Sequence, residues 1–161
     1  MNEDAGLRKH IIDLLRGGDA HADFEKAIGG LPAALRGARV PNLPYSVWGL
    51  VEHMRIAQWD ILEFSRNAEH VSPKWPEGYW PATDAPPDAA AWEASLASFR
   101  RDLSALQALV RDPATDLLKP IPHGTGQTVL REALLAADHN AYHVGELVAL
   151  RRLLGAWDTK K

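Results

Sequence analysis

The chain has 161 residues, of which 46% are hydrophobic and 24% are charged, a composition typical of one globular domain rather than of a disordered chain. The absence of cysteine excludes a disulfide framework, an iron–sulfur cluster, a cysteine-ligated zinc site and a cysteine nucleophile. The net charge of −3, with only short basic pairs, argues against a nucleic-acid partner. Because the first residues do not resemble a signal peptide and no apolar run approaches ~18 residues, we expect a cytoplasmic protein with no membrane partner, folded as one domain over residues 1–161.

Helical periodicity dominates the first half of the chain. Apolar spacing predicts a first arm in two pieces, residues 5–16 and 20–28, separated by Gly17-Gly18 and with Asp19 as the N-cap of the second piece. A further helical turn is expected at residues 33–36. Ser46 is a suitable N-cap for a helix running to about residue 66. Its apolar side chains recur every three or four positions and predict one inward face: Val47, Leu50, Met54, Ala57, Ile61 and Phe64.

A proline-rich loop is expected between this helix and the next. Residues 71–88 hold five prolines, which cannot continue a helix, together with Trp75, Tyr79 and Trp80. These rings either close the end of a helical bundle or line a pocket. Asp88 is then the predicted N-cap of a helix that ends before Pro113. Another turn-rich loop covers residues 120–126. The pattern predicts an all-α four-helix bundle with long crossover loops and a last helix over about residues 128–154.

The last helix carries apolar side chains on two opposite sides, so we expect both sides to be buried. One sector contains Leu130, Leu134, Ala137, Ala141, Val144 and Val148, and the other contains Leu135, Ala136, Leu147, Leu150 and Leu154. One side faces the bundle interior. The other needs a second cover, which is either another part of this chain or a second copy in a homodimer.

Three of the seven histidines form a candidate metal site. His139 and His143 are four residues apart on the last helix, a spacing that lets two imidazoles converge on one ion. His53 lies near the inward face of the second long helix, and three buried imidazoles are costly unless they are satisfied. A divalent ion satisfies all three, although a pair of hydrogen-bonded core histidines is the simpler reading of His139 and His143 alone. His10, His21, His70 and His123 are expected at the surface or at helix ends, with His123 as a possible rim residue.

Two segments resemble the DinB/YfiT-like superfamily. Residues 48–60, WGLVEHMRIAQWD, look like its first metal-histidine helix, and residues 130–147, ending in DHNAYHVGEL, look like its second. The resemblance implies an up-down-down-up four-helix bundle, usually dimeric, with nickel, zinc, iron or manganese held by His53, His139 and His143. It also implies a range of activities, since some relatives are S-transferases that use bacillithiol, mycothiol or glutathione, one type is a thiol-dependent isomerase, and others are described as metal-dependent hydrolases.

A three-histidine site suits a metal-dependent enzyme. Three neutral ligands leave the ion its full charge, which lowers the pKa of a bound water or thiol. We therefore expect a hydrolase or an S-transferase that takes its thiol from a small cofactor. Glu146 is the first candidate for a base, a partner of a ligand histidine or a further ligand, and a solvated surface role is equally open. Glu132 and Asp60 rank lower.

Two functions without catalysis fit the same sequence. One is a module that binds a metal or a small molecule, and the other is a structural dimer whose histidines are only core polar groups. A di-iron carboxylate bundle is disfavoured, because the sequence has no Glu-x-x-His motif.

Overall fold

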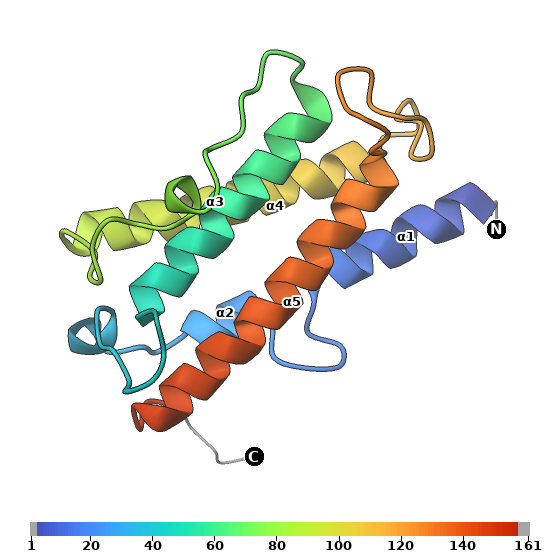
Figure 1. The fold of residues 1–161 in the computed structure, drawn as a ribbon. Helices are drawn as coiled ribbons and strands as arrows, with labels where there is room; N and C mark the ends of the chain where they lie inside the picture. The colour runs from blue at the N-terminus through green and yellow to red at the C-terminus, as the bar shows by residue number, and fades with distance from the viewer. Residues whose placement is uncertain (1–2, 158–161) are drawn as a thin grey trace.

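The computed structural model describes residues 3–157, in which every regular element is helical (Figure 1). This confirms the predicted all-α class. Among the described helices, none is long and apolar enough to cross a membrane. The elements in chain order are α1 (Glu3–Arg16), α2 (Phe24–Ile28), the 3-10 turn η1 (Ala33–Leu35), α3 (Val47–Arg66), the 3-10 turn η2 (Glu77–Tyr79), α4 (Ala89–Arg111) and α5 (Val129–Leu153).

Helices α3 and α4 begin at the capping residues that the sequence predicts, and α5 begins within one residue of the expected position. The Ser46 hydroxyl accepts a hydrogen bond from the Gly49 amide at the start of α3, and Asp88 and Thr128 do the same for α4 and α5. The start of α2 was predicted wrongly, because its N-cap is Asp23 and not Asp19. Asp23 lies directly before Phe24, which is 7% exposed and packs in the core, so burial fixes where this short helix begins.

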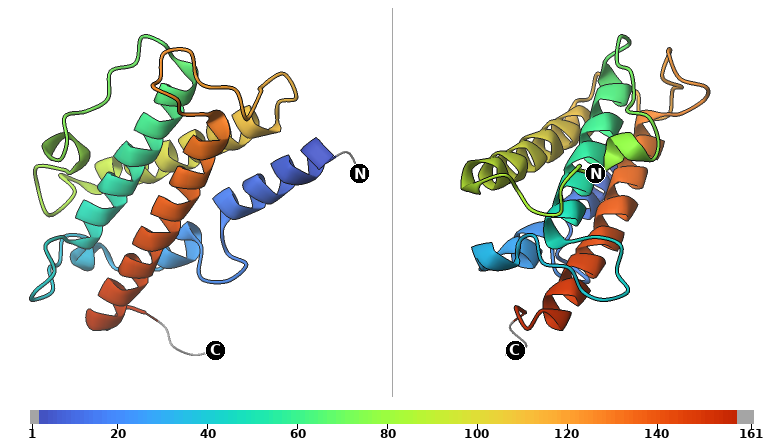
Figure 2. Two further views of the ribbon diagram at one scale, coloured as in Figure 1. Left: turned by 45° about the vertical axis from the view of Figure 1, so that its right-hand side comes forward. Right: turned by 60° about the vertical axis from the view of Figure 1, so that its left-hand side comes forward.

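Helices α3 and α5 run side by side in opposite directions, as Figure 1 shows. Helix α4 packs against α3, and α1 packs against both α4 and α5. Figure 2 shows α2 close to the C-terminal half of α5, against which it packs. Apolar side chains form two core clusters. The first joins α2, α3, α4 and α5 around Leu50, Met54 and Phe99, and the second joins α1 to the other end of the same long helices around Leu62 and Leu106.

Helix α5 is covered on both sides by its own chain. Ala137, Val144 and Val148 of one predicted sector are buried, as are Ala136, Leu147 and Leu150 of the other. Contacts with α1, α2, α3 and α4 supply this cover, so these two sectors do not require a second copy. Some large apolar side chains of α5 nevertheless stay exposed: Leu134, Leu135, Tyr142 and Leu153.

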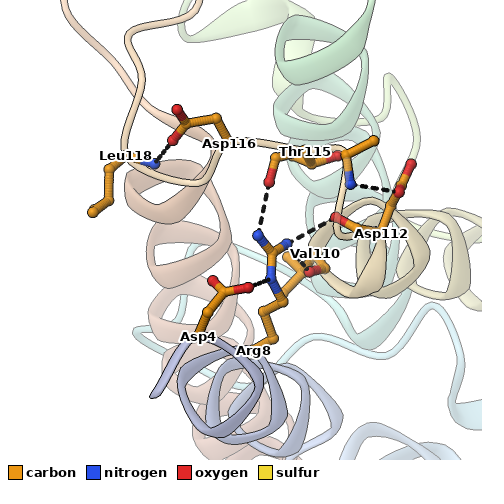
Figure 3. Close-up of polar contacts among 8 residues, drawn as sticks. Asp4, Arg8, Val110, Asp112, Thr115, Asp116 and Leu118 are labelled. Atoms are coloured by element: carbon orange, nitrogen blue, oxygen red, sulfur yellow. Dashed lines mark hydrogen bonds and ion pairs between the residues drawn. The ribbon is translucent and has the colours of Figure 1, made fainter. Parts of the chain in front are cut away.

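A buried arginine ties α1 to the end of α4. The Arg8 guanidinium donates hydrogen bonds to the backbone carbonyls of Val110, Asp112 and Thr115 at 2.8 to 2.9 Å, and Nε contacts Asp4 at 2.8 Å (Figure 3). A cation is favoured there, because the last carbonyls of a helix carry a partial negative charge and lack partners within the helix. Arg8 thus replaces the missing partners of the α4 C-terminus.

Candidate metal centre

His53, His139 and His143 converge on one point between α3 and α5. One ring nitrogen from each histidine lies within 4.8 Å of the other two. Nε2 of His53 and Nε2 of His139 are 3.1 Å apart, and the three ring centroids are separated by 4.4 to 4.9 Å. His53 and His143 are buried and His139 is partly buried. The structure therefore brings residue 53, which the sequence places near the inward face of its helix, together with the two histidines of α5.

The ring of His53 is held by the loop between α3 and α4. Its Nδ1 lies 2.9 Å from the backbone carbonyl of Tyr79, and the Trp80 ring stacks on it with a centroid distance of 4.1 Å and an interplanar angle of 2°. Burial lowers the pKa of His53, an effect that the Tyr79 carbonyl opposes. The loop therefore fixes the plane of this ring and leaves its Nε2 directed at the other two histidines.

The ring of His143 is held by its own helix. Nδ1 lies 2.6 Å from Oε2 of Glu146, one turn further along α5. The other carboxylate oxygen, Oε1, accepts a hydrogen bond from the Tyr45 hydroxyl at 2.5 Å. Burial and the Glu146 carboxylate raise the pKa of the Tyr45 hydroxyl well above its usual range, so it keeps its proton. Both carboxylate oxygens are thus engaged, and Glu146 acts here on the orientation of His143.

The third ring, that of His139, has no such support on its Nδ1. This nitrogen is buried and has no hydrogen-bond partner. Burial, together with the neighbouring His143 and His53, lowers the pKa of His139 to about 4, so the ring is neutral near pH 7. A neutral imidazole is the form that binds a metal ion.

The remaining carboxylates and histidines lie apart from this cluster. Asp60 binds Nε2 of His70 at 2.7 Å and the Tyr79 hydroxyl at 2.6 Å, so it anchors the loop that carries Tyr79. The expectation for His70 is corrected, because its side chain is only 6% exposed. Glu132 is buried and pairs with Arg131. His10, His21 and His123 are exposed, and His123 contacts the Phe64 carbonyl near the end of α3 rather than the rim of the cluster.

Aromatic side chains surround the histidines. The Trp80 ring stacks on His53 and is also nearly parallel to the Tyr45 ring, with centroids 5.9 Å apart, while Tyr142 meets the His143 ring edge-on at 5.0 Å. Of the three loop rings, Trp80 and Tyr79 contribute to the site and Trp75 is exposed. Tyr45 was not found from the sequence. It is 101 residues from Glu146, so no local spacing joins the two.

Comparison with known proteins identifies the family of this chain. The family model described as the DinB superfamily matches residues 18–147. The chain belongs to the DinB superfamily. The DinB match contains the three histidines and Glu146, and it begins after α1. No curated protein and no solved structure gives a significant match.

Proposed function

We propose that this DinB protein is a divalent-metal-dependent enzyme whose ion is held by His53, His139 and His143. The observation that carries the proposal is the convergence of three ring nitrogens within 4.8 Å of one another in a largely buried position. Such a donor set leaves coordination positions open for water or substrate, as in catalytic sites. Imidazole ligands suit zinc, nickel and iron, and manganese is the fourth ion that the family resemblance implies.

The residues present fit an ion of this kind. Nδ1 of His53 and Nδ1 of His143 each face an acceptor, the Tyr79 carbonyl and the Glu146 carboxylate, which is the arrangement that outer partners of metal-binding histidines have. The lowered pKa values of His53 and His139 keep both rings neutral at physiological pH. When bound, the ion would supply positive charge that acidifies a coordinated thiol or water.

The state of Glu146 favours S-transfer over hydrolysis. Because both of its carboxylate oxygens are engaged, by His143 and Tyr45, it is poorly placed to take a proton from water. A thiol needs less help, since its free pKa is about 8.5 whereas that of water is about 15.7. As the chain has no cysteine, the thiol must come from a low-molecular-weight cofactor such as bacillithiol, mycothiol or glutathione.

Metal content is the first test. Purified protein is expected to contain close to one transition-metal ion per chain by elemental analysis, and His143→Ala is expected to lose it. His123→Ala is the matched control, because this histidine is exposed and lies outside the cluster. A protein that binds none of the four metals after dialysis and reloading would refute the proposal.

Activity is the second test. Metal-loaded protein is assayed with each thiol and a generic electrophile, and turnover is expected only when a thiol is present. Turnover without thiol on an ester or amide panel would favour the hydrolase. Stoichiometric metal without turnover in either assay would instead favour the non-catalytic binding module.

We further propose the family arrangement for the whole molecule, an up-down-down-up four-helix bundle that forms a homodimer. The antiparallel α3 and α5 and the exposed Leu135, Tyr142 and Leu153 on α5 support it. Light scattering at micromolar concentration tests the dimer. A monomer at every concentration measured would exclude the homodimer.

A further inference from the structure

The loop after α3 is attached to that helix at two points, and Tyr79 makes both attachments. Its backbone carbonyl accepts a hydrogen bond from Nδ1 of His53 at 2.9 Å. Its hydroxyl donates to Oδ2 of Asp60 at 2.6 Å. His53 and Asp60 are seven residues apart on α3, so they lie on one face of the helix, two turns or roughly 10 Å apart along its axis. Tyr79 therefore lies along α3 and spans two of its turns.

A buried histidine of the same loop holds the far attachment. Nε2 of His70 lies 2.7 Å from Oδ1 of Asp60, the carboxylate oxygen that Tyr79 does not use. The side chain of His70 is 6% exposed and that of Asp60 is 13% exposed. The Trp59 ring meets the His70 ring edge-on, with centroids 5.0 Å apart. One carboxylate thus engages two loop residues that are nine positions apart, and its own orientation is fixed by both.

The near attachment acts on the metal centre. The Tyr79 carbonyl and the Trp80 ring contact His53 from consecutive residues, so a displacement of Tyr79 would disturb both contacts. The turn η2, which ends at Tyr79, contains no buried residue. Because apolar burial does little to hold this turn, the hydrogen bond from Tyr79 to Asp60 has a large share in fixing where the Tyr79 carbonyl lies.

We propose that Asp60 is a positioning residue for the metal site, acting on His53 through the hydroxyl and the backbone carbonyl of Tyr79. The inference rests on the proposed metal site. Asp60 lies two turns from His53 and does not bind the ion itself. Because coupling between two equilibria is reciprocal, docking of the loop on α3 favours metal binding by the same factor by which bound metal favours the docked loop.

Zinc affinity tests the effect on the metal site. Tyr79→Phe removes the hydroxyl and leaves the backbone carbonyl, so affinity measured by chelator competition is expected to fall roughly 3- to 10-fold, less than on loss of a direct partner of a ligand histidine. Thr83→Val is the matched control, because the Thr83 hydroxyl belongs to the same loop but donates to the Ala85 carbonyl at 2.8 Å. Unchanged affinity in Tyr79→Phe would overturn the inference and leave the metal site standing. A natural protein that binds no zinc would overturn the proposed function itself.

Two substitutions of Asp60 test the acceptor. Asp60→Asn keeps an oxygen that accepts from the Tyr79 hydroxyl, and its amide can donate to the other tautomer of His70. Asp60→Ala keeps neither contact. Zinc affinity is expected to stay within about threefold of the natural value in Asp60→Asn and to fall roughly 10-fold in Asp60→Ala. Equal affinities in the two variants would contradict a positioning role for this side chain.

Hydrogen exchange measures the coupling from the side of the loop, in the natural protein and without relying on the fold of an Asp60 variant. The amides of Gly78 and Tyr79 donate to carbonyls of their own loop. One equivalent of zinc is expected to slow their exchange, and to slow it less in Tyr79→Phe. The Gly124 amide, in the loop between α4 and α5, should not respond. Bound zinc that leaves Gly78 and Tyr79 unchanged, or that slows Gly124 equally, would refute the inference.

Discussion

Oε2 of Glu146 lies 2.6 Å from Nδ1 of His143, and Oε1 of the same carboxylate accepts a hydrogen bond from the Tyr45 hydroxyl. The pair is one turn apart on α5, so the helix itself sets its geometry. Tyr45 comes from the segment just before α3. It connects Glu146 of α5 to the Trp80 ring, which stacks on His53.

Replacing Glu146 is expected to weaken metal binding. Glu146→Ala leaves Nδ1 of His143 without its acceptor, and such losses usually lower metal affinity roughly 10- to 100-fold. Glu146→Gln keeps an oxygen that accepts from Nδ1 and should lose less. Chelator competition with zinc gives the affinities. Tyr45→Phe is the control, because it leaves the bond to His143 in place. An affinity in Glu146→Ala equal to that of the natural protein would place the carboxylate outside the metal site.

Trp80 is expected to matter for the site in a way that Trp75 does not. Trp80 stacks on His53, whereas Trp75 is 68% exposed. Trp80→Ala removes the face against which the imidazole packs, so we expect zinc affinity to fall several-fold and Trp75→Ala to leave it unchanged. Isothermal titration of both variants checks this. Similar affinities for the two would mean that the Tyr79 carbonyl alone fixes His53.

Metal-free protein should lose stability in mild acid through His139. The folded-state pKa of this ring is about 4, because of burial and the neighbouring histidines, against about 6.5 when unfolded. Between these two pKa values the unfolded chain binds a proton on this ring that the folded chain does not. The stabilisation is therefore fully present above pH 6.5 and is lost as the pH falls toward 4. The loss is at most about 3 kcal/mol.

Urea unfolding at pH 7 and pH 4.5 in the presence of a chelator measures this effect. The variant His139→Gln should show a smaller difference between the two pH values, since it lacks the titrating ring. An unchanged difference would mean that other groups dominate the acid sensitivity. Saturating zinc should move the loss to lower pH, because bound metal competes with protons for the ring nitrogens.

Arg8 is expected to be a main contributor to stability outside the site. Arg8→Met keeps much of the side chain but leaves the carbonyls of Val110, Asp112 and Thr115 without their donor. We expect a loss of about 2–4 kcal/mol in the free energy of unfolding. Arg100→Met is the matched control, because Arg100 forms an exposed ion pair with Glu25, which contributes about 1 kcal/mol or less. Equal effects would show that the Arg8 bonds add nothing beyond surface electrostatics.

The sequence predicts well what depends on periodicity and local chemistry. The starts of α3 at Ser46 and of α4 at Asp88 follow from capping, and the position of His53 follows from its place beside the inward face of α3. The spacing of His139 and His143 is local as well. These features suffice to place three imidazoles together.

Contacts across the fold are not predictable in this way. Tyr45 reaches Glu146, Asp60 holds Tyr79, and Gln58 orients Asn140 only because helices and loops distant in sequence pack together. His70 was expected at the surface because it follows a helix end, yet the loop folds back and its ring pairs with Asp60. The start of α2 depended on the burial of Phe24 rather than on the stronger local signal of Asp19 after two glycines.

The attachment of α1 has a consequence for how the boundary of this molecule is drawn. The DinB match starts at residue 18, yet Ile11 and Leu15 lie in the core and Arg8 completes the end of α4. A recombinant protein that begins at residue 18 would therefore expose to water the apolar surface of α4 and α5 that α1 covers. We therefore expect the smallest unit able to fold to include α1, which lies outside the family match.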